Sequence, residues 1–245
     1  MAYVTLPKGR EPKALPLIAL IHGGPWARDD WGFNAEVQML AGMGYAVLQP
    51  QFRGSSGFGR EHLKKSFGQW GLSMQDDITD GVQSLIKQGV VDAKRVCIMG
   101  ASYGGYATMM GLVKDPGLCR CGVNLLGVTD MFYHASSGRS HDSEVNYFLD
   151  SWVGDPVKLR DQFTATSPAL QAQRITVPVY MVCGKKDRRV PVVHGREMRD
   201  ALQKHGKAHE YVELEYEEHG SSSEAVQVDV YKGVQAFLRK HIPAQ

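Results

Sequence analysis

A serine at position 102 stands in the pentapeptide Gly-Ala-Ser-Tyr-Gly at residues 100–104, directly after a largely apolar run at residues 95–99. This G-x-S-x-G spacing between a strand pattern and a helix pattern is typical of a nucleophile held on a sharp turn. The small flanking residues let the helix and the strand pack closely enough to maintain that turn. The pattern therefore predicts attack of the Ser102 hydroxyl on a carbonyl carbon.

A serine hydroxyl is a weak nucleophile and needs two further side chains. An imidazole must take its proton, and a carboxylate must orient the imidazole and stabilise its charged form. With a serine on such a turn, the chain order is serine, acid, histidine. Asp187 and His219 follow two successive strand patterns after Ser102, and we predict these three residues as the catalytic triad. The alternatives are a solvated turn carboxylate at Asp187 and His194 as the base.

Acyl transfer also requires hydrogen-bond donors for the oxyanion, and these are usually backbone N–H groups. The sequence His-Gly-Gly-Pro at residues 22–25 ends the first core strand pattern, where glycines let amides approach a substrate. A plain strand-ending turn is the alternative interpretation, and the two are compatible. The second donor is expected to be the N–H of Tyr103, the residue after the nucleophile.

Alternating strands and helices must position these groups. Continuous apolar runs indicate strands buried on both faces of a parallel sheet, and apolar spacings of three and four indicate helices. The expected strands cover residues 15–21, 45–49, 95–99, 121–126, 178–183 and 210–214, and the expected helices cover residues 35–41, 74–88, 193–204 and about 223–240. This order predicts an α/β-hydrolase fold, a mostly parallel sheet with helices on both faces and ligands bound beyond the carboxyl ends of the strands.

Residues 127–176 break the alternation with aromatic, histidine and serine residues of weak periodicity. We expect a single domain over residues 1–245, with this stretch as a short, mostly helical excursion over the strand ends. Its aromatic side chains are candidates for a substrate pocket, and ordinary core packing is an equal alternative. The candidate pocket residues are Trp26, Phe132, Tyr147, Phe148 and Trp152, together with Tyr103.

The composition argues against several classes of partner. The net charge is +2 with scattered Lys and Arg, which argues against a nucleic-acid or membrane-binding face. No apolar run approaches the roughly 18 residues of a membrane span, and the N-terminal residues show no signal-peptide pattern. The four cysteines fall in strand patterns or in a Cys-x-Cys pair that suits neither an easy disulfide nor a zinc site. We therefore expect reduced thiols, a cytoplasmic location and no metal.

With these residues in view, the chain resembles the catalytic domain of the prolyl oligopeptidase family of serine peptidases, in particular its acylaminoacyl-peptidase-like branch. The resemblance implies a triad of Ser102, Asp187 and His219, with the amides of Gly24 and Tyr103 as the oxyanion hole. It also implies an N-terminal β-propeller, which nothing in these 245 residues can form. The matching motifs lie at residues 3–7, 22–26, 52–59, 100–106, 167–168, 184–191 and 218–220.

The expected function is hydrolysis of a carboxylic acyl bond through an acyl-enzyme, with no metal or organic cofactor. Because the site would be open without a propeller, and esters have better leaving groups than amides, the first hypothesis is a carboxylesterase acting on short-chain esters. The alternative is an oligopeptidase or acylaminoacyl-peptidase-type peptidase acting on short peptides. A non-catalytic binding module is the third candidate. Apolar surface left without a propeller also suggests a homo-oligomer.

Overall fold

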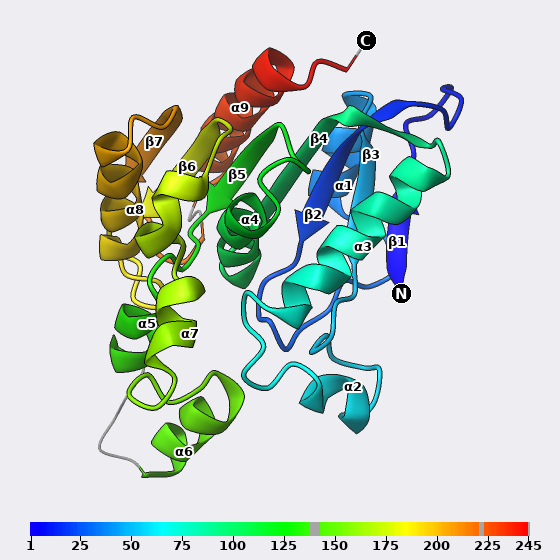
Figure 1. The fold of residues 1–245 in the computed structure, drawn as a ribbon. Coiled ribbons are helices and arrows are strands. Elements are labelled where there is room, and N and C mark those ends of the chain that lie inside the picture. Colours follow the sequence, from blue (N-terminus) through cyan, green and yellow to red (C-terminus); the bar gives the residue numbers. More distant parts are fainter. Residues whose placement is uncertain (138–142, 221–222, 245) are drawn as a thin grey trace.

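The computed structural model describes residues 1–137, 143–220 and 223–244, and for residues 143–146 and 148 the backbone alone. Its framework is a seven-stranded sheet in the order β1-β3-β2-β4-β5-β6-β7 (Figure 1). Strand β1 is antiparallel to β3, and the other neighbouring pairs are parallel. The strands are β1 (Ala2–Thr5), β2 (Leu15–Ile21), β3 (Ala46–Pro50), β4 (Val91–Ala101), β5 (Cys121–Leu125), β6 (Val179–Gly184) and β7 (His209–Leu214).

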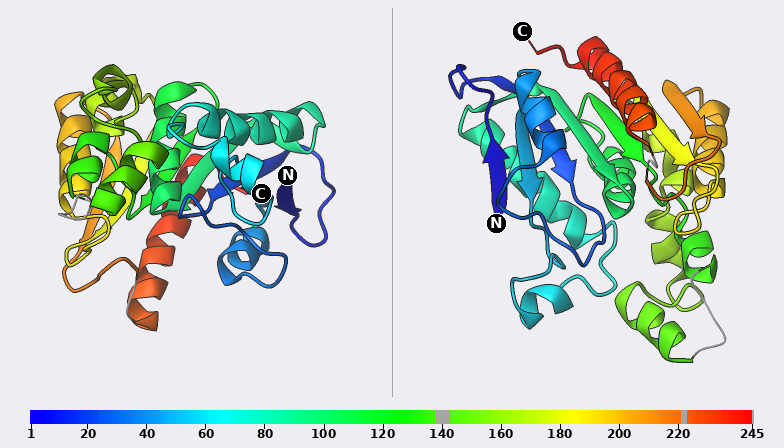
Figure 2. Two further views of the ribbon diagram at one scale, coloured as in Figure 1. Left: turned by 90° about the horizontal axis from the view of Figure 1, so that it is seen from below. Right: turned by 180° about the vertical axis from the view of Figure 1, so that it is seen from behind.

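Helices cover both faces of this sheet (Figures 1 and 2). Along β2, Leu17 and Ala19 belong to one hydrophobic core, and Ile18 and Leu20 to a second core on the opposite face, because successive side chains of a strand alternate. Helices α3, α4 and α8 pack on the first core, and α1 and α9 on the second. The helices are α1 (Ala35–Gly42), α2 (Arg60–Lys64), α3 (Ser73–Lys87), α4 (Tyr103–Lys114), α5 (Met131–Ser137), α6 (Ser143–Trp152), α7 (Arg160–Ala165), α8 (Val193–Lys204) and α9 (Glu224–His241), with a 3₁₀ helix η1 (Pro168–Arg174).

Between β5 and β6 the chain forms α5, α6, α7 and η1. Figure 1 shows α5, α6 and α7, with α2 opposite them, beyond the end of the sheet at which the parallel strands finish. This group of helices therefore lies next to the sheet edge where the candidate catalytic residues are attached. The extent of the domain over residues 1–245 stays a prediction.

The mostly parallel sheet with helices on both faces is confirmed, and two elements were not anticipated. The antiparallel strand Ala2–Thr5 alternates between exposed and half-buried residues, so it lacks the continuous apolar run that identified the other strands. Helix α2 has five residues and buries none of them, which leaves no periodic signal.

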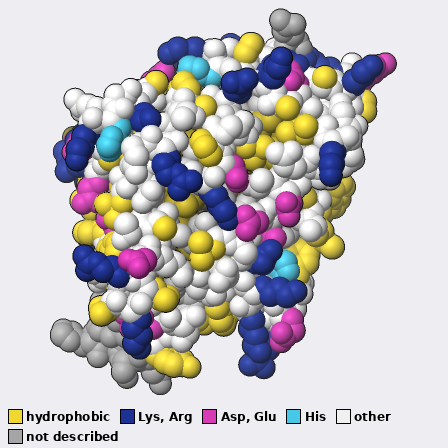
Figure 3. Space-filling view, in the orientation of Figure 1, with side chains coloured by type: hydrophobic (Ala, Val, Ile, Leu, Met, Phe, Trp, Pro, Cys, Tyr) yellow, Lys and Arg dark blue, Asp and Glu magenta, His cyan; other side chains and the backbone are white. Residues whose placement is uncertain are grey.

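Charged side chains of both signs are interspersed on the face seen in Figure 3. No helix in the described part of the chain is both long and apolar enough to cross a membrane.

Candidate active site

Ser102 sits between the end of β4 and the first residue of α4, with φ 58° and ψ −120°. A non-glycine residue at positive φ is strained, and a nucleophile elbow is one of the places where such strain persists. A hydrogen bond fixes the turn to the end of β5, because the Ser102 N–H donates to the Leu125 carbonyl at 2.9 Å. Gly100 and Gly104 are required on either side, since a Cβ on either residue would collide with the Ile21 carbonyl oxygen.

Three side chains form a hydrogen-bonded line at this turn. Ser102 Oγ lies 2.9 Å from His219 Nε2, and His219 Nδ1 lies 2.7 Å from Asp187 Oδ2. The Asp187 side chain is fully buried, and that of His219 is 18 % exposed. The ionised Asp187 carboxylate can only accept a hydrogen bond, so we assign the ring proton of His219 to Nδ1, which donates to it. The unprotonated Nε2 can then accept a hydrogen bond from the Ser102 hydroxyl. The structure thus brings together the three residues predicted as a triad.

The loops after β6 and β7 hold the carboxylate and the imidazole. Asp187 Oδ1 accepts hydrogen bonds from the backbone N–H groups of Arg189 and Val190 at 2.8 and 2.9 Å, which fixes the carboxylate plane. Gly184 lets the two loops approach, since a Cβ there would lie 2.7 Å from the Glu217 carbonyl oxygen and would collide with that of Glu218. The order of the strands in the sheet therefore places Asp187 and His219 in contact although 31 residues separate them in the chain.

The glycine turn after β2 packs directly against Ser102. A Cβ on Gly23 would lie 3.5 Å from Ser102 Cβ, so the backbone of this turn borders the serine. Gly24 has φ 122°, which strongly favours glycine. The Tyr103 N–H belongs to the first turn of α4, where an amide has no partner within the helix. These two amides lie at the cavity of Ser102, in the region where the oxyanion hole was predicted.

The cavity at Ser102 has a volume of about 340 Å³. Of the predicted site residues, Ser102, His219, Gly24, Tyr103 and Trp26 line it. Residues that sequence reasoning missed also line it, and they are Trp70, Val128, His134, Leu149, Val153, Arg189 and Val190. Trp70 precedes α3 in a loop and His134 lies on the short helix α5, both in stretches of weak periodicity, so only their aromatic character could have signalled them.

Three of the other candidate pocket residues, Trp152, Phe132 and Tyr147, do not line this cavity. Trp152 packs edge-on against the ring of Trp26, with ring centroids 4.5 Å apart. Phe132 packs against Phe163, with ring centroids 5.4 Å apart. Tyr147, on the helix α6, is 75 % exposed to solvent and is absent from the lining of the cavity. The side chain of Phe148 lies outside the described residues.

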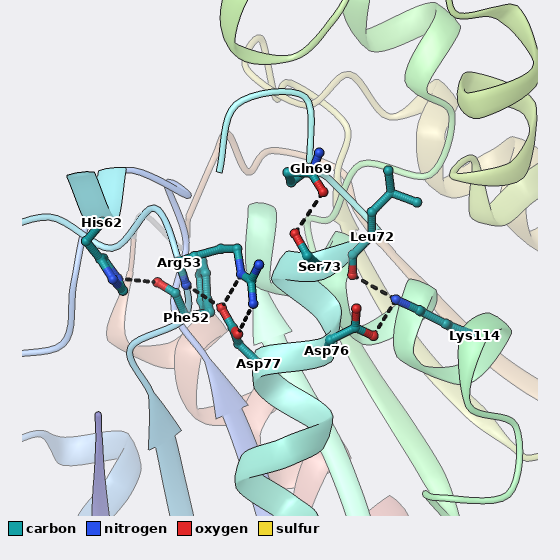
Figure 4. A network of polar contacts seen from close by, with 9 residues as sticks. All are labelled: Phe52, Arg53, His62, Gln69, Leu72, Ser73, Asp76, Asp77 and Lys114. Carbon is teal, nitrogen blue, oxygen red and sulfur yellow. Dashed lines mark hydrogen bonds and ion pairs between the residues drawn. The ribbon is translucent and has the colours of Figure 1, made fainter. Parts of the chain in front are cut away.

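A network of polar contacts anchors the loop that carries Phe52 and Trp70 (Figure 4). The Arg53 guanidinium donates to both Asp77 carboxylate oxygens, at 2.8 and 2.6 Å, and the Arg53 N–H donates to Oδ2 at 2.7 Å. Burial opposes ionisation of Asp77, but its pKa is lowered because the Arg53 contacts outweigh that penalty. Phe52 stacks on His22 at 4.3 Å, so this clamp supports the glycine turn.

His194, the alternative base, is engaged elsewhere. Its Nδ1 accepts from the backbone N–H groups of Thr129 and Asp130 at 3.3 and 3.4 Å, and its side chain is buried. Burial, and then the neighbouring His134, lower the pKa of His194 to about 3. The neutral imidazole of His194 therefore fixes the segment of Thr129 and Asp130, next to the cavity-lining His134, and has a structural role.

This burial predicts acid sensitivity of the fold. Below pH 6.5 the unfolded chain protonates His194 and the folded chain does not, so stability falls as the pH drops from about 6.5 towards 3. His194→Asn keeps an acceptor near the position of Nδ1 but cannot be protonated. We expect the variant to lose about 2 kcal/mol less than the wild type between pH 7.5 and pH 5 in urea unfolding. His205→Asn, at the exposed end of α8, is the matched control, and equal losses in all three proteins would contradict the assignment.

The sequence profile described as "Prolyl oligopeptidase family" matches residues 31–245. The chain belongs to this family. It is 37 % identical over 229 residues to dipeptidyl aminopeptidase BIII of Pseudoxanthomonas mexicana. The aligned region covers 90 % of this chain and 33 % of that protein. A puromycin-hydrolysing peptidase of Mycobacterium tuberculosis superposes with a TM-score of 0.91 at 25 % identity, over 100 % of this chain and 37 % of that one.

A further solved structure shows the same fold. An acylaminoacyl peptidase crystallised with Z-Gly-Gly-Phe-chloromethyl ketone has a TM-score of 0.89 at 22 % identity, over 100 % of this chain and 40 % of its own. The chain thus spans about a third of the length of these proteins. The resemblance to the family and the prediction of a serine hydrolase are confirmed.

The first functional hypothesis, a carboxylesterase for short-chain esters, is wrong. The relatives are a dipeptidyl aminopeptidase, a puromycin-hydrolysing peptidase and an acylaminoacyl peptidase, and these names support the peptidase alternative. The error arose because an ester and an amide are attacked by the same triad, so the predicted residues carried no information about the leaving group.

Proposed function

We propose that this chain is the catalytic part of a serine peptidase that hydrolyses short peptides. The observation that carries the proposal is the line of hydrogen bonds from Ser102 Oγ through His219 to the buried Asp187 carboxylate. Such a line, next to a strained serine and the candidate oxyanion amides of Gly24 and Tyr103, serves acyl transfer and has no role in simple ligand binding. The peptidase names of the relatives support a peptide substrate.

In the first half of the reaction, Ser102 Oγ attacks the peptide carbonyl carbon while His219 Nε2 takes the hydroxyl proton. The carbonyl oxygen becomes an oxyanion, which the amides of Gly24 and Tyr103 stabilise. His219 then gives its proton to the leaving amine, the C–N bond breaks, and the acyl group stays on Ser102. Asp187 remains ionised and stabilises the imidazolium.

In the second half, water replaces the amine. His219 takes a proton from the water as it attacks the ester carbon, and the same two amides hold the second oxyanion. Collapse of this intermediate returns the proton to Ser102 Oγ and releases the carboxylic acid. No group outside the described site is needed to balance either step.

The test is cleavage of peptidyl p-nitroanilides by the purified chain, with released products identified by mass spectrometry. We expect release of p-nitroaniline together with the free peptide acid, and stoichiometric labelling of Ser102 by a fluorophosphonate. Labelling without any peptide cleavage would refute peptidase activity of this chain while leaving an activated serine. Absence of labelling in the folded protein would refute the triad.

Two further predictions concern the surroundings of the protein. All four cysteines are buried and none forms a disulfide, which supports the proposal of a reducing, cytoplasmic location.

Trp31 and Phe33 are 84 % and 87 % exposed beside the edge strand β1, which supports self-association. A molar mass that rises with protein concentration in light scattering is the expected result.

A further inference from the structure

The cavity at Ser102 contains an imidazole that the proposed mechanism does not use. His134, on α5, lines this cavity together with the nucleophile. Its ring stacks on Trp70, with centroids 5.4 Å apart and an angle of 27°. Trp70 in turn meets the ring of Tyr103 edge-on at 4.7 Å. The imidazole is therefore two ring contacts away from the residue that follows Ser102.

The wall around this imidazole is mostly apolar. It includes Trp26, Trp70, Tyr103, Val128, Leu149, Val153 and Val190, and Arg189 is a charged residue in the same lining. The Tyr103 hydroxyl is directed to Met74 Sδ at 3.6 Å, so it does not serve the cavity. No hydrogen bond among the described residues uses a ring nitrogen of His134. A polar group with free hydrogen-bonding capacity thus stands in an aromatic pocket.

The state of this imidazole is fixed by its burial. Desolvation lowers the pKa of His134 to about 4, and the ring of His194 lies behind it at 6.5 Å. At neutral pH both rings are uncharged, so His134 offers one N–H donor and one nitrogen acceptor. Such a group pairs with a neutral hydroxyl or amide and does not favour a carboxylate.

We propose that His134 makes this site selective for peptides whose residue on the acyl side of the cleaved bond is tyrosine. This inference rests on the proposed peptidase function and deepens it. The side chain next to the attacked carbonyl enters the cavity first, because Ser102 and the two candidate oxyanion amides border the cavity. The aromatic walls accept the ring, and the hydroxyl pairs with the imidazole.

The energetic basis is the cost of leaving a buried polar group unpaired. A phenylalanine side chain fills the same walls and expels water from His134 without replacing its hydrogen bond. A site built to pair with a hydroxyl rejects the analogue that lacks it more strongly than an apolar pocket rejects an added hydroxyl. One neutral hydrogen bond in a partly open cavity corresponds to a preference of about three- to tenfold.

The experiment compares Z-Gly-Gly-Xaa p-nitroanilides in which Xaa is tyrosine or 4-methylphenylalanine, which has nearly the same shape without the hydroxyl. We expect the wild type to show a kcat/KM at least about threefold higher for the tyrosine substrate. In His134→Leu this ratio should fall to about 1 or below, and in His134→Gln, which retains a donor and an acceptor, it should be largely restored. Because the ratio is taken within one protein, a general loss of activity or stability cancels.

Phe132→Leu is the matched control, since Phe132 lies on the same helix, packs on Phe163 and does not line the cavity. Its ratio should equal that of the wild type. A wild-type ratio of 1 or less, or a ratio unchanged in His134→Leu, overturns the proposal. The same ratios are measured from the rates of inactivation by Z-Gly-Gly-Tyr and Z-Gly-Gly-(4-methyl-Phe) chloromethyl ketones. If the ketones are discriminated but no anilide is cleaved, peptide hydrolysis is refuted and the tyrosine selectivity is supported. If the anilides are cleaved without discrimination, peptide hydrolysis is supported and the tyrosine selectivity is refuted.

Discussion

Asp187→Asn is expected to lower kcat/KM on a peptide substrate by about 10⁴-fold while the fold persists. In the wild type, Oδ1 accepts two backbone N–H groups and Oδ2 accepts from His219. An asparagine must keep its oxygen towards the two amides, since the opposite orientation would set its NH₂ group against two donors. The NH₂ group then faces His219 Nδ1, which must become an acceptor. The ring proton moves to Nε2, and Nε2 can no longer accept from Ser102.

The measurement is kcat/KM on the peptidyl anilide, with Ser102→Ala as the blank and the unfolding midpoint as a check of the fold. Asp200→Asn is the matched control, because Asp200 is exposed on α8 and pairs with the neighbouring Arg199. We expect its activity to stay within about twofold of the wild type. A loss of less than tenfold in Asp187→Asn would show that Asp187 does not set the tautomer of His219.

The second large effect is on the fold. In Gly104→Ala the added Cβ collides with the Ile21 carbonyl oxygen, lies 2.9 Å from the carbonyl carbon and 3.3 Å from the His22 carbonyl oxygen. All three atoms are backbone at the centre of the sheet, so no flexible side chain can yield. Helix α4 must shift away from β2, and the strained turn at Ser102 shifts with it. We expect a loss of at least about 3 kcal/mol of stability, or a fall in Tm of about 10 °C.

Gly42→Ala is the control, because Gly42 is also helical and a Cβ there meets nothing within 4 Å. This substitution should raise stability by up to about 1 kcal/mol, since alanine favours the helix. Thermal unfolding and fluorophosphonate labelling are followed in both variants. A Gly104→Ala protein with wild-type Tm and labelling rate would mean that the close packing of α4 on β2 does not hold the nucleophile.

The sequence by itself determined most of the sheet, and it predicted Ser102 as the nucleophile with Asp187 and His219 as its acid and base. The central strands are buried on both faces and therefore carry unbroken apolar runs, which are visible without coordinates. Ser102 was found because its turn demands small residues at fixed positions. Asp187 and His219 were found because the fold fixes their order along the chain and their place at strand ends. Their hydrogen-bonded contact agrees with that prediction, while their catalytic roles await the tests above.

Tertiary structure decided which residues surround the serine. Trp70 lies in the loop before α3, His134 on α5 and Arg189 in the loop after β6, and only the packing of these three segments brings them to one cavity. Of the aromatic residues expected there, Trp26 in the loop after β2 lines the cavity, whereas Tyr147 on α6 is exposed and does not line it. The edge strand β1 was likewise missed, because pairing with β3 defines it and its own side chains do not. Residue type and chain order fix a reaction, but the walls of a pocket depend on contacts between distant segments that leave no local pattern.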